Sequence, residues 1–320
     1  MRILFAGSSE IAIPVMRTLC RTEEIAGVLT NPDTPKGRHG TPTPTEIGKE
    51  TEKILKEFKE QGREAFPVLK PEKLDAALRE QVSLLKCDLL VSFAYGHIFG
   101  EKFLSLFPLG GINVHPSLLP LYRGPSPIQA AILNRDTVTG ITIQKLAKEM
   151  DCGDILAQEK FYLTGYETLG TLSETAAEKA ALMMPEVIKK IAEGKQGTPQ
   201  DHDTASYCRL VAKEDAFINW KCSVQEIEAK IRAFNPSPLC RTFHEKRELF
   251  ILKSGIFKNE GCKDVPGKVL GIDKEHGILV QTGEGILCVK ELQYQNKKAL
   301  FFRDFINGAK NFPGSILGVC

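Results

Sequence analysis

Residues 2–31 read RILFAGSSEIAIPVMRTLCRTEEIAGVLTN, and their pattern indicates the fold class of the N-terminal region. It starts with the apolar run RILFAG and passes through Ser8-Ser9 into a helix that we expect to end near Cys20. A second apolar run follows over residues 24–31. A strand, a helix and a strand of these lengths predict a βαβ unit, in which a crossover helix joins two parallel strands. The N-terminal region is therefore expected to be an α/β domain.

The same alternation continues through the first half of the chain. We expect helices over 45–61, 72–85 and 168–194, and strands over 87–96, 111–117, 139–146 and 154–163. The strands up to residue 117 are nearly continuous apolar runs, which is typical of strands covered on both faces. This pattern predicts a Rossmann-like parallel sheet.

Residues 194–208 are rich in Gly, Thr and Asp and lack helical periodicity, so we expect the linker there. Beyond it, VQEIEAKIRAFN predicts one helix, and the short apolar runs that follow are separated by glycines. Such spacing is typical of a small barrel. We therefore expect an α/β domain over 1–204 and a smaller OB-like β-barrel domain over 205–320.

The composition narrows the class of protein. The chain has 320 residues, 42% of them hydrophobic and 26% charged, and its apolar runs are too short to cross a bilayer. Its nine cysteines are scattered without a CxxC pair, which favours a reducing cytoplasm with neither disulfides nor a metal site. Residues 1–207 carry 24 Lys+Arg against 27 Asp+Glu, and residues 208–320 carry 18 against 13. The basic C-terminal part permits a nucleic-acid partner, although solvated lysines would give the same balance.

The stretch GINVHPSLLPLYRGPSPIQ, residues 111–129, is the strongest candidate for a site. Asn113 and His115 are two positions apart on a strand, so their side chains point to the same face. They end that strand, where open α/β sheets place their ligands, and a proline-rich loop follows. The turn MDCGD adds two acids, Asp151 and Asp154, of which we favour Asp151 as the partner of the histidine.

These residue types suit one reaction class. An Asn amide can donate to an oxyanion that forms on a carbonyl carbon. A His whose tautomer is fixed by a carboxylate can accept a proton from an attacking amine. Together they indicate acyl transfer to an amine without a covalent enzyme intermediate, whereas a satisfied polar pair in a strand is the plainer alternative. A dinucleotide cofactor is disfavoured, because Gly7 is the only glycine in the first turn.

With these residues together, the chain resembles the methionyl-tRNA formyltransferases over essentially its full length. The matching stretches are FAGSSEIA, NPDTPKGR, VSFAYG, INVHPSLLPLYRGPSPIQ, TGITI, MDCGDIL, INW, IRAFNPSP and TGEGILCV. The resemblance implies transfer of the formyl group of 10-formyltetrahydrofolate to initiator methionyl-tRNA by a monomeric enzyme. It assigns Asn113, His115 and Asp151 as catalytic. It places the folate against Ser117, Leu118, Leu119 and Pro120 and against the segment Phe93, Ala94, Tyr95 and Gly96.

The resemblance also implies contacts to the tRNA through Lys36, Arg38 and Arg123, with 1–204 as the formyltransferase domain and 205–320 as a tRNA-binding one. The proline-rich segment 31–46, expected to be a long loop, lacks the further lysines usual in these enzymes. Two alternatives stay open. One is a folate-dependent formyltransferase for a sugar amine, against which Gln129 and the stretch IRAFNP speak. The other is a non-catalytic RNA-binding protein with a relic of the fold.

Overall fold

The structure is a computed structural model that describes residues 1–36 and 40–318. It has two compact units. The first comprises Met1–Pro127, Val138–Phe161 and Ser173–Arg209, and the second Ile128–Thr137, Tyr162–Leu172 and Leu210–Cys320. Among the described residues, no helix is both long enough and apolar enough to span a bilayer.

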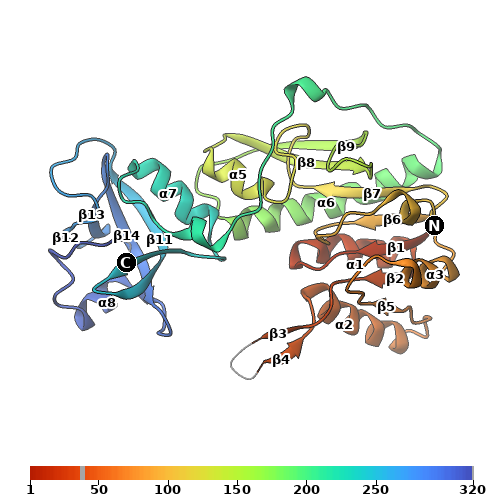
Figure 1. Cartoon of the computed structure of the whole chain (residues 1–320), viewed down its shortest axis with the longest axis horizontal. Coiled ribbons are helices and arrows are strands. Elements are labelled where there is room, and N and C mark those ends of the chain that lie inside the picture. The colour runs from red at the N-terminus through yellow and green to blue at the C-terminus, as the bar shows by residue number, and fades with distance from the viewer. Residues whose placement is uncertain (37–39, 319–320) are drawn as a thin grey trace. The chain divides into compact units, whose positions relative to one another are not determined.

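A seven-stranded sheet forms the first unit, in the order β5-β2-β1-β6-β7-β8-β9 (Figure 1). The strands are β1 (Arg2–Ala6), β2 (Glu24–Leu29), β5 (Val68–Leu69), β6 (Leu89–Ser92), β7 (Gly111–His115), β8 (Val138–Lys145) and β9 (Ile155–Tyr162). The five neighbouring strands β5, β2, β1, β6 and β7 are parallel to one another, whereas β8 runs antiparallel to β7. The predicted Rossmann-like parallel sheet is confirmed.

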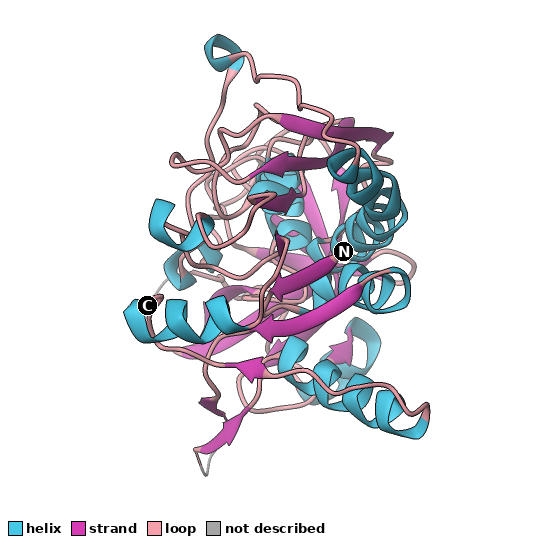
Figure 2. Cartoon of the chain, turned by 90° about the vertical axis from the view of Figure 1, so that its right-hand side faces the viewer, coloured by secondary structure: helices cyan, strands magenta, loops and turns pink. Residues whose placement is uncertain are grey.

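Helices lie on both sides of this sheet (Figure 2). They are α1 (Ile13–Thr22), α2 (Glu46–Glu60), α3 (Ala76–Leu84), α4 (Glu101–Leu104) and α6 (Leu169–Ala192). The chain moves outward from β1 through β2 to β5 and then returns to β6 on the other side of β1. The strand order therefore reverses between β1 and β6, and ligands of open α/β sheets bind at the carboxyl ends of strands beside such a reversal.

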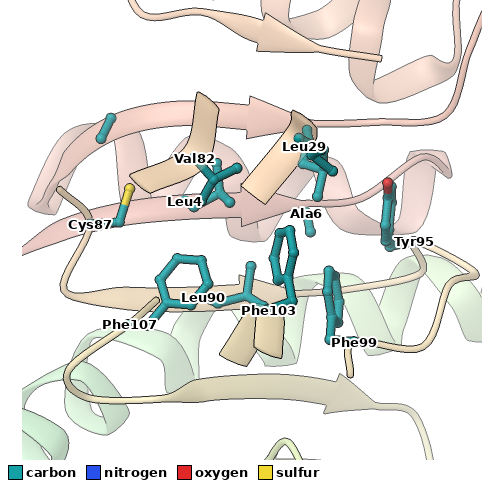
Figure 3. Packing of buried hydrophobic residues seen from close by; sticks show 12 residues of the cluster. Leu4, Ala6, Leu29, Val82, Cys87, Leu90, Tyr95, Phe99, Phe103 and Phe107 are labelled. Carbon is teal, nitrogen blue, oxygen red and sulfur yellow. The ribbon is translucent and has the colours of Figure 1, made fainter. Parts of the chain in front are cut away.

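An aromatic row supports the segment that follows β6. Tyr95, Phe99, Phe103 and Phe107 succeed one another along one face of the sheet (Figure 3), with ring centroids 5.5, 5.3 and 5.8 Å apart. All four rings are buried in a core that includes Leu4 and other apolar residues of the strands. Aromatic pairs of this kind each contribute about 0.5–1.5 kcal/mol beyond the burial of their area. The row therefore fixes the chain next to the carboxyl end of β6.

The segment 31–46 contains regular structure that the sequence did not predict. Strands β3 (Thr34–Lys36) and β4 (Thr41–Thr43) pair as an antiparallel hairpin, with Pro35 opposite Pro42. Both strands of a two-stranded ribbon are edge strands, so a proline without an N–H is tolerated in each. The expectation of a loop without secondary structure was therefore wrong. Residues 37–39, which include Arg38, lie outside the described residues.

The second unit is built on an antiparallel sheet in the order β10-β11-β14-β13-β12, with β15 paired to β14. Its strands are β10 (Cys240–His244), β11 (Arg247–Lys258), β12 (Val269–Asp273), β13 (Gly277–Gln281), β14 (Ile286–Tyr294) and β15 (Leu300–Phe301). Its helices are α5 (Pro127–Leu133), α7 (Val224–Ala233) and α8 (Phe302–Gly308). Near the C-terminus, Gly318 bridges to Phe243 of β10 and Ile316 bridges to Lys268 beside β12. This segment connects the two edges of the sheet, as in a small barrel.

Candidate active site

Strand β7 places Asn113 and His115 on one face, as their spacing predicts. In the ladder with β8, Asn113 lies opposite Gln144 and His115 lies opposite Thr142. Directly opposed residues of an antiparallel pair share a face, so these four side chains lie together. The Asn113 side chain is half-buried, and its carboxamide makes no hydrogen bond to any other residue that the structure describes. That amide is available to a substrate.

The imidazole of His115 is buried between two acceptors. Its Nε2 donates to the carbonyl oxygen of Tyr122 over 2.9 Å, and its Nδ1 lies 3.5 Å from Oδ2 of Asp151. Burial lowers the pKa of His115, while the Asp151 carboxylate and the Tyr122 carbonyl act in the opposite direction. Because a carbonyl only accepts, Nε2 carries a hydrogen here. Before Nε2 can take a proton from an amine, it must release both Tyr122 and this hydrogen. The neutral tautomer with a free Nε2 carries its hydrogen on Nδ1, which faces Asp151.

Asp151 is held by hydrogen bonds to both carboxylate oxygens. Gln144 Nε2 donates to Oδ1, and the backbone N–H of Gly124 donates to Oδ2, each over 2.8 Å. Asp154 is more exposed, and its carboxylate lies 3.8 Å from Nζ of Lys145. The turn therefore places Asp151 beside His115 and directs Asp154 to a surface ion pair.

The backbone geometry at position 124 requires a glycine. It has a φ of +114°, and an added Cβ would lie 2.2 Å from the carbonyl oxygen of Cys208. Gly124→Ala would force this backbone away from Asp151. We expect a loss of activity together with a loss of roughly 1–3 kcal/mol or more of unfolding free energy. Gly110→Ala is the matched control, because Gly110 also has positive φ (+74°) but a Cβ there meets nothing within 4 Å.

Urea unfolding and the transfer rate of the two variants test this prediction. Gly110→Ala should lose about 1–2 kcal/mol of stability, the usual cost of a left-handed conformation, and keep its turnover. Equal turnover in Gly110→Ala and Gly124→Ala would show that the contact between Gly124 and Asp151 is unimportant.

The segment that holds Ser117, Leu118, Leu119 and Pro120 is bound to β8 by two hydrogen bonds. Thr142 Oγ1 donates to the carbonyl of Ser117 over 2.7 Å and accepts from the N–H of Leu119 over 3.1 Å. Ser117 and Leu119 are buried, whereas Leu118 and Pro120 are partly exposed. The same threonine lies opposite His115, so β8 fixes this segment relative to the histidine.

The segment Phe93–Gly96 presents its backbone. The rings of Phe93 and Tyr95 are buried, and burial raises the pKa of Tyr95 to about 12. Ala94 and Gly96 are exposed and have φ values of +50° and +86°. The carbonyl of Ala94 already accepts from the N–H of Ser8 over 3.1 Å, whereas an added Cβ at Gly96 would meet nothing within 4 Å. Gly96 is therefore the more open of the two positions for the expected backbone contacts to a flat ring.

Arg123 lies where a phosphate cannot reach it without rearrangement. Its side chain is 1% exposed. The guanidinium donates to Oε1 of Gln200 over 2.7 and 3.2 Å, to Nδ1 of His202 over 3.2 Å and to the hydroxyl of Tyr207 over 3.3 Å. This arrangement does not suit the tRNA contact expected of Arg123. Of the other expected contacts, the backbone of Lys36 belongs to β3, and Arg38 lies outside the described residues.

Two further residues at this site, Gln144 and Gln200, are not among those expected from the sequence. Gln144 could have been found, because Thr142 and Gln144 are polar residues at period 2 that alternate with Ile141 and Ile143 in β8. Gln200 lies in the segment expected to be a linker, and no local pattern distinguishes it. Within the described part of the chain, no group of three or more His, Cys, Asp and Glu side chains could hold a metal ion.

Comparison with known proteins adds the following similarities. Residues 1–188 match the profile of the family described as formyl transferase, and residues 210–310 match that of its C-terminal domain. A Treponema denticola protein named methionyl-tRNA formyltransferase is 45% identical over 98% of each chain. HypX from Aquifex aeolicus, solved with tetrahydrofolic acid, aligns with a TM-score of 0.62 at 17% identity, over 96% of this chain and 47% of that one. WlaRD, a sugar 3N-formyl transferase, aligns with a TM-score of 0.61 at 19% identity, over 93% and 99%.

Proposed function

The chain belongs to the formyl transferase family, and from this premise we propose that it formylates the α-amino group of initiator methionyl-tRNA, with 10-formyltetrahydrofolate as donor. The relative named methionyl-tRNA formyltransferase matches both units at 45% identity, which favours this acceptor over a sugar amine. The likeness to the sugar enzyme, at 19% identity, supports the fold alone.

The observation that carries the chemistry is the free amide of Asn113 on the same face as the pair of His115 and Asp151. In the reaction, the amine nitrogen bonds to the formyl carbon, the bond from that carbon to N10 of the folate breaks, and a proton moves from the amine to N10. Asn113 would donate to the oxyanion that develops on the formyl oxygen. His115 would manage the proton, with its charged form stabilised by Asp151.

The folate fits the two segments that border this face. The exposed segment Ala94–Gly96 would bind the pteridine ring through its backbone at the carboxyl end of β6. The segment Ser117–Pro120, fixed through Thr142, would form the opposite wall. Walls that are fixed before binding lower the entropic cost of bringing the formyl carbon to the amine.

The remaining assignments are also proposals. The tRNA would bind through Lys36 and Arg38 and through the basic C-terminal part of the chain, since a polyanion is attracted by both. We propose that residues 1–204 carry catalysis and 205–320 the tRNA contacts; the boundary falls between the two ranges that match the family. We further propose that the enzyme is a cytoplasmic monomer.

A formyl-transfer assay tests the proposed function. The purified chain is given 10-formyltetrahydrofolate and methionyl-tRNA, with uncharged tRNA and a 4-amino sugar nucleotide as alternative acceptors. We expect formyl transfer to methionyl-tRNA only. Transfer to the sugar nucleotide instead would establish the sugar-amine alternative, and folate binding without any transfer would favour the non-catalytic one.

Binding of the tRNA should depend strongly on salt. For about three to five phosphate contacts, the slope of log affinity against log salt concentration should be roughly −3 to −4. Arg38→Ala should raise the KM for methionyl-tRNA and reduce the size of this slope by about one, because arginine binds phosphate in a bidentate manner. Folate affinity should change little. The control is Arg21→Ala, an exposed arginine at the opposite end of the sheet, in the last turn of α1. If Arg38→Ala matches Arg21→Ala at every salt concentration, the 31–46 segment does not bind the acceptor stem.

A further inference from the structure

A directional chain of hydrogen bonds leads from Arg123 to the candidate active site. The guanidinium of Arg123 can only donate, and it donates twice to Oε1 of Gln200. Gln200 Nε2 lies 2.7 Å from the carbonyl of Gly153 and 2.9 Å from that of Asp151. It also lies 3.1 Å from Oε1 of Gln144. Arg123, Gln144 and Gln200 are 1%, 2% and 6% exposed, so solvent cannot replace these partners.

The orientation of both amides follows from these contacts. If the Gln200 amide were reversed, its NH₂ would face the guanidinium and its oxygen would face three oxygens. Gln144 Oε1 must then accept from Gln200, so Gln144 turns its NH₂ toward Oδ1 of Asp151, 2.8 Å away. If Gln144 turned its oxygen toward Oδ1 instead, that oxygen would repel the Asp151 carboxylate. Arg123 therefore determines that Asp151 meets a donor.

We propose that Gln144 is a positioning residue of the transfer reaction, and that Gln200 and Arg123 fix the orientation of its amide. Gln144 holds one oxygen of Asp151, the Gly124 N–H holds the other, and the carboxylate is thereby directed at Nδ1 of His115. The inference rests on the proposed function. It assigns the buried arginine a role in place of the expected phosphate contact.

The geometry favours a role in positioning over one in packing alone. Gln144 occupies β8 directly opposite Asn113, so the strand pair that carries the free amide also carries the residue that orients Asp151. The distance of 3.5 Å from Asp151 to His115 is longer than a good hydrogen bond. A carboxylate that holds its partner this loosely depends on other contacts for its direction.

Gln144→Met tests the proposal, because methionine keeps the length and apolar contacts of glutamine but offers no amide. Since a hydrogen bond to a charged group contributes about 1.5–3 kcal/mol, we expect kcat to fall roughly ten- to a hundredfold. The KM for folate should stay unchanged. Gln281→Met is the matched control: Gln281 is also buried (1% exposed) and donates to backbone carbonyls in the second unit. Loss of the Gln281 amide should lower the Tm about as much as Gln144→Met does, and it should leave kcat near the wild-type value.

A double-mutant cycle with Asp151→Asn separates positioning from general structure. If Gln144 acts through Asp151, adding Gln144→Met to Asp151→Asn should lower kcat by less than about twofold further. If the fold losses in kcat of Gln144→Met and Asp151→Asn multiply in the double variant, the proposal is overturned. It is also overturned if Gln144→Met alone keeps a kcat near the wild-type value. In either case the wild-type assay still stands, so the proposed function would be unaffected.

Should Gln144→Met fail to fold, Gln144→Glu decides the question. At neutral pH the introduced carboxylate would repel Asp151, whereas at lower pH a proton on that carboxylate would restore a donor toward Oδ1. The ratio of variant to wild-type kcat should then rise as the pH falls, with the fold checked by circular dichroism at each pH. A ratio that is independent of pH would contradict the proposal.

Discussion

Asn113→Ala is expected to lower kcat roughly a hundred- to a thousandfold, the usual effect of removing one oxyanion donor. The structure also predicts that this substitution has little effect on the stability of the fold. The Asn113 amide makes no hydrogen bond within the described chain and is half-buried, so the variant leaves no polar partner unsatisfied. The unfolding free energy should change by no more than about 1 kcal/mol. A large kinetic effect with a small effect on stability is the signature of a group that acts on the substrate.

Single-turnover rates with methionyl-tRNA, together with urea unfolding, measure both quantities. Asn307→Ala is the control, because Asn307 is an exposed asparagine on α8 of the second unit. Near-normal turnover in Asn113→Ala would remove this residue from the mechanism. His115→Ala should also abolish most transfer, but with a greater loss of stability, because the ring is 4% exposed and bonded to Tyr122.

The fold was predictable because its signals are local. An apolar run such as RILFAG, followed by an amphipathic helix, indicates a βαβ unit regardless of the rest of the chain. The hairpin of β3 and β4 was missed because Pro35 and Pro42 normally argue against strands, and here each lies on an edge. The sequence alone does not show that both strands of this ribbon will be edges, where proline is tolerated.

The candidate site was predictable only where strand period or turn chemistry brought residues together. Asn113 and His115 share a face by spacing alone. For Arg123 the resemblance implied a contact to the tRNA, and an arginine is almost never fully buried unless it is paired. Its partner Gln200 lies 77 positions farther along the chain, and only the folded structure brings the two together. Contacts of this range have no signature in a single sequence, which is why the link between Arg123 and Gln200 could not be predicted.

Asp151→Asn should lower kcat roughly a hundred- to ten-thousandfold, because an amide cannot stabilise a charged imidazole and can select the wrong tautomer. The replacement also places an NH₂ against a donor, either Gln144 Nε2 or the N–H of Gly124. Since the Asp151 charge acts to raise the pKa of His115, its removal should move the limb of the kcat–pH profile that reports His115 to lower pH.

Asp154→Asn is the matched comparison, with the same chemical change three positions along the chain. Its side chain is 39% exposed and its ion pair with Lys145 spans 3.8 Å, an arrangement that contributes about 0–1 kcal/mol. We therefore expect kcat and the pH profile of Asp154→Asn to remain near wild type. If Asp154→Asn lowered kcat more than Asp151→Asn, Asp154 rather than Asp151 would be the residue that orients His115. That outcome would require the turn to reorganise when substrate binds, because in this structure the hydrogen bonds from Gln144 and Gly124 reach Asp151.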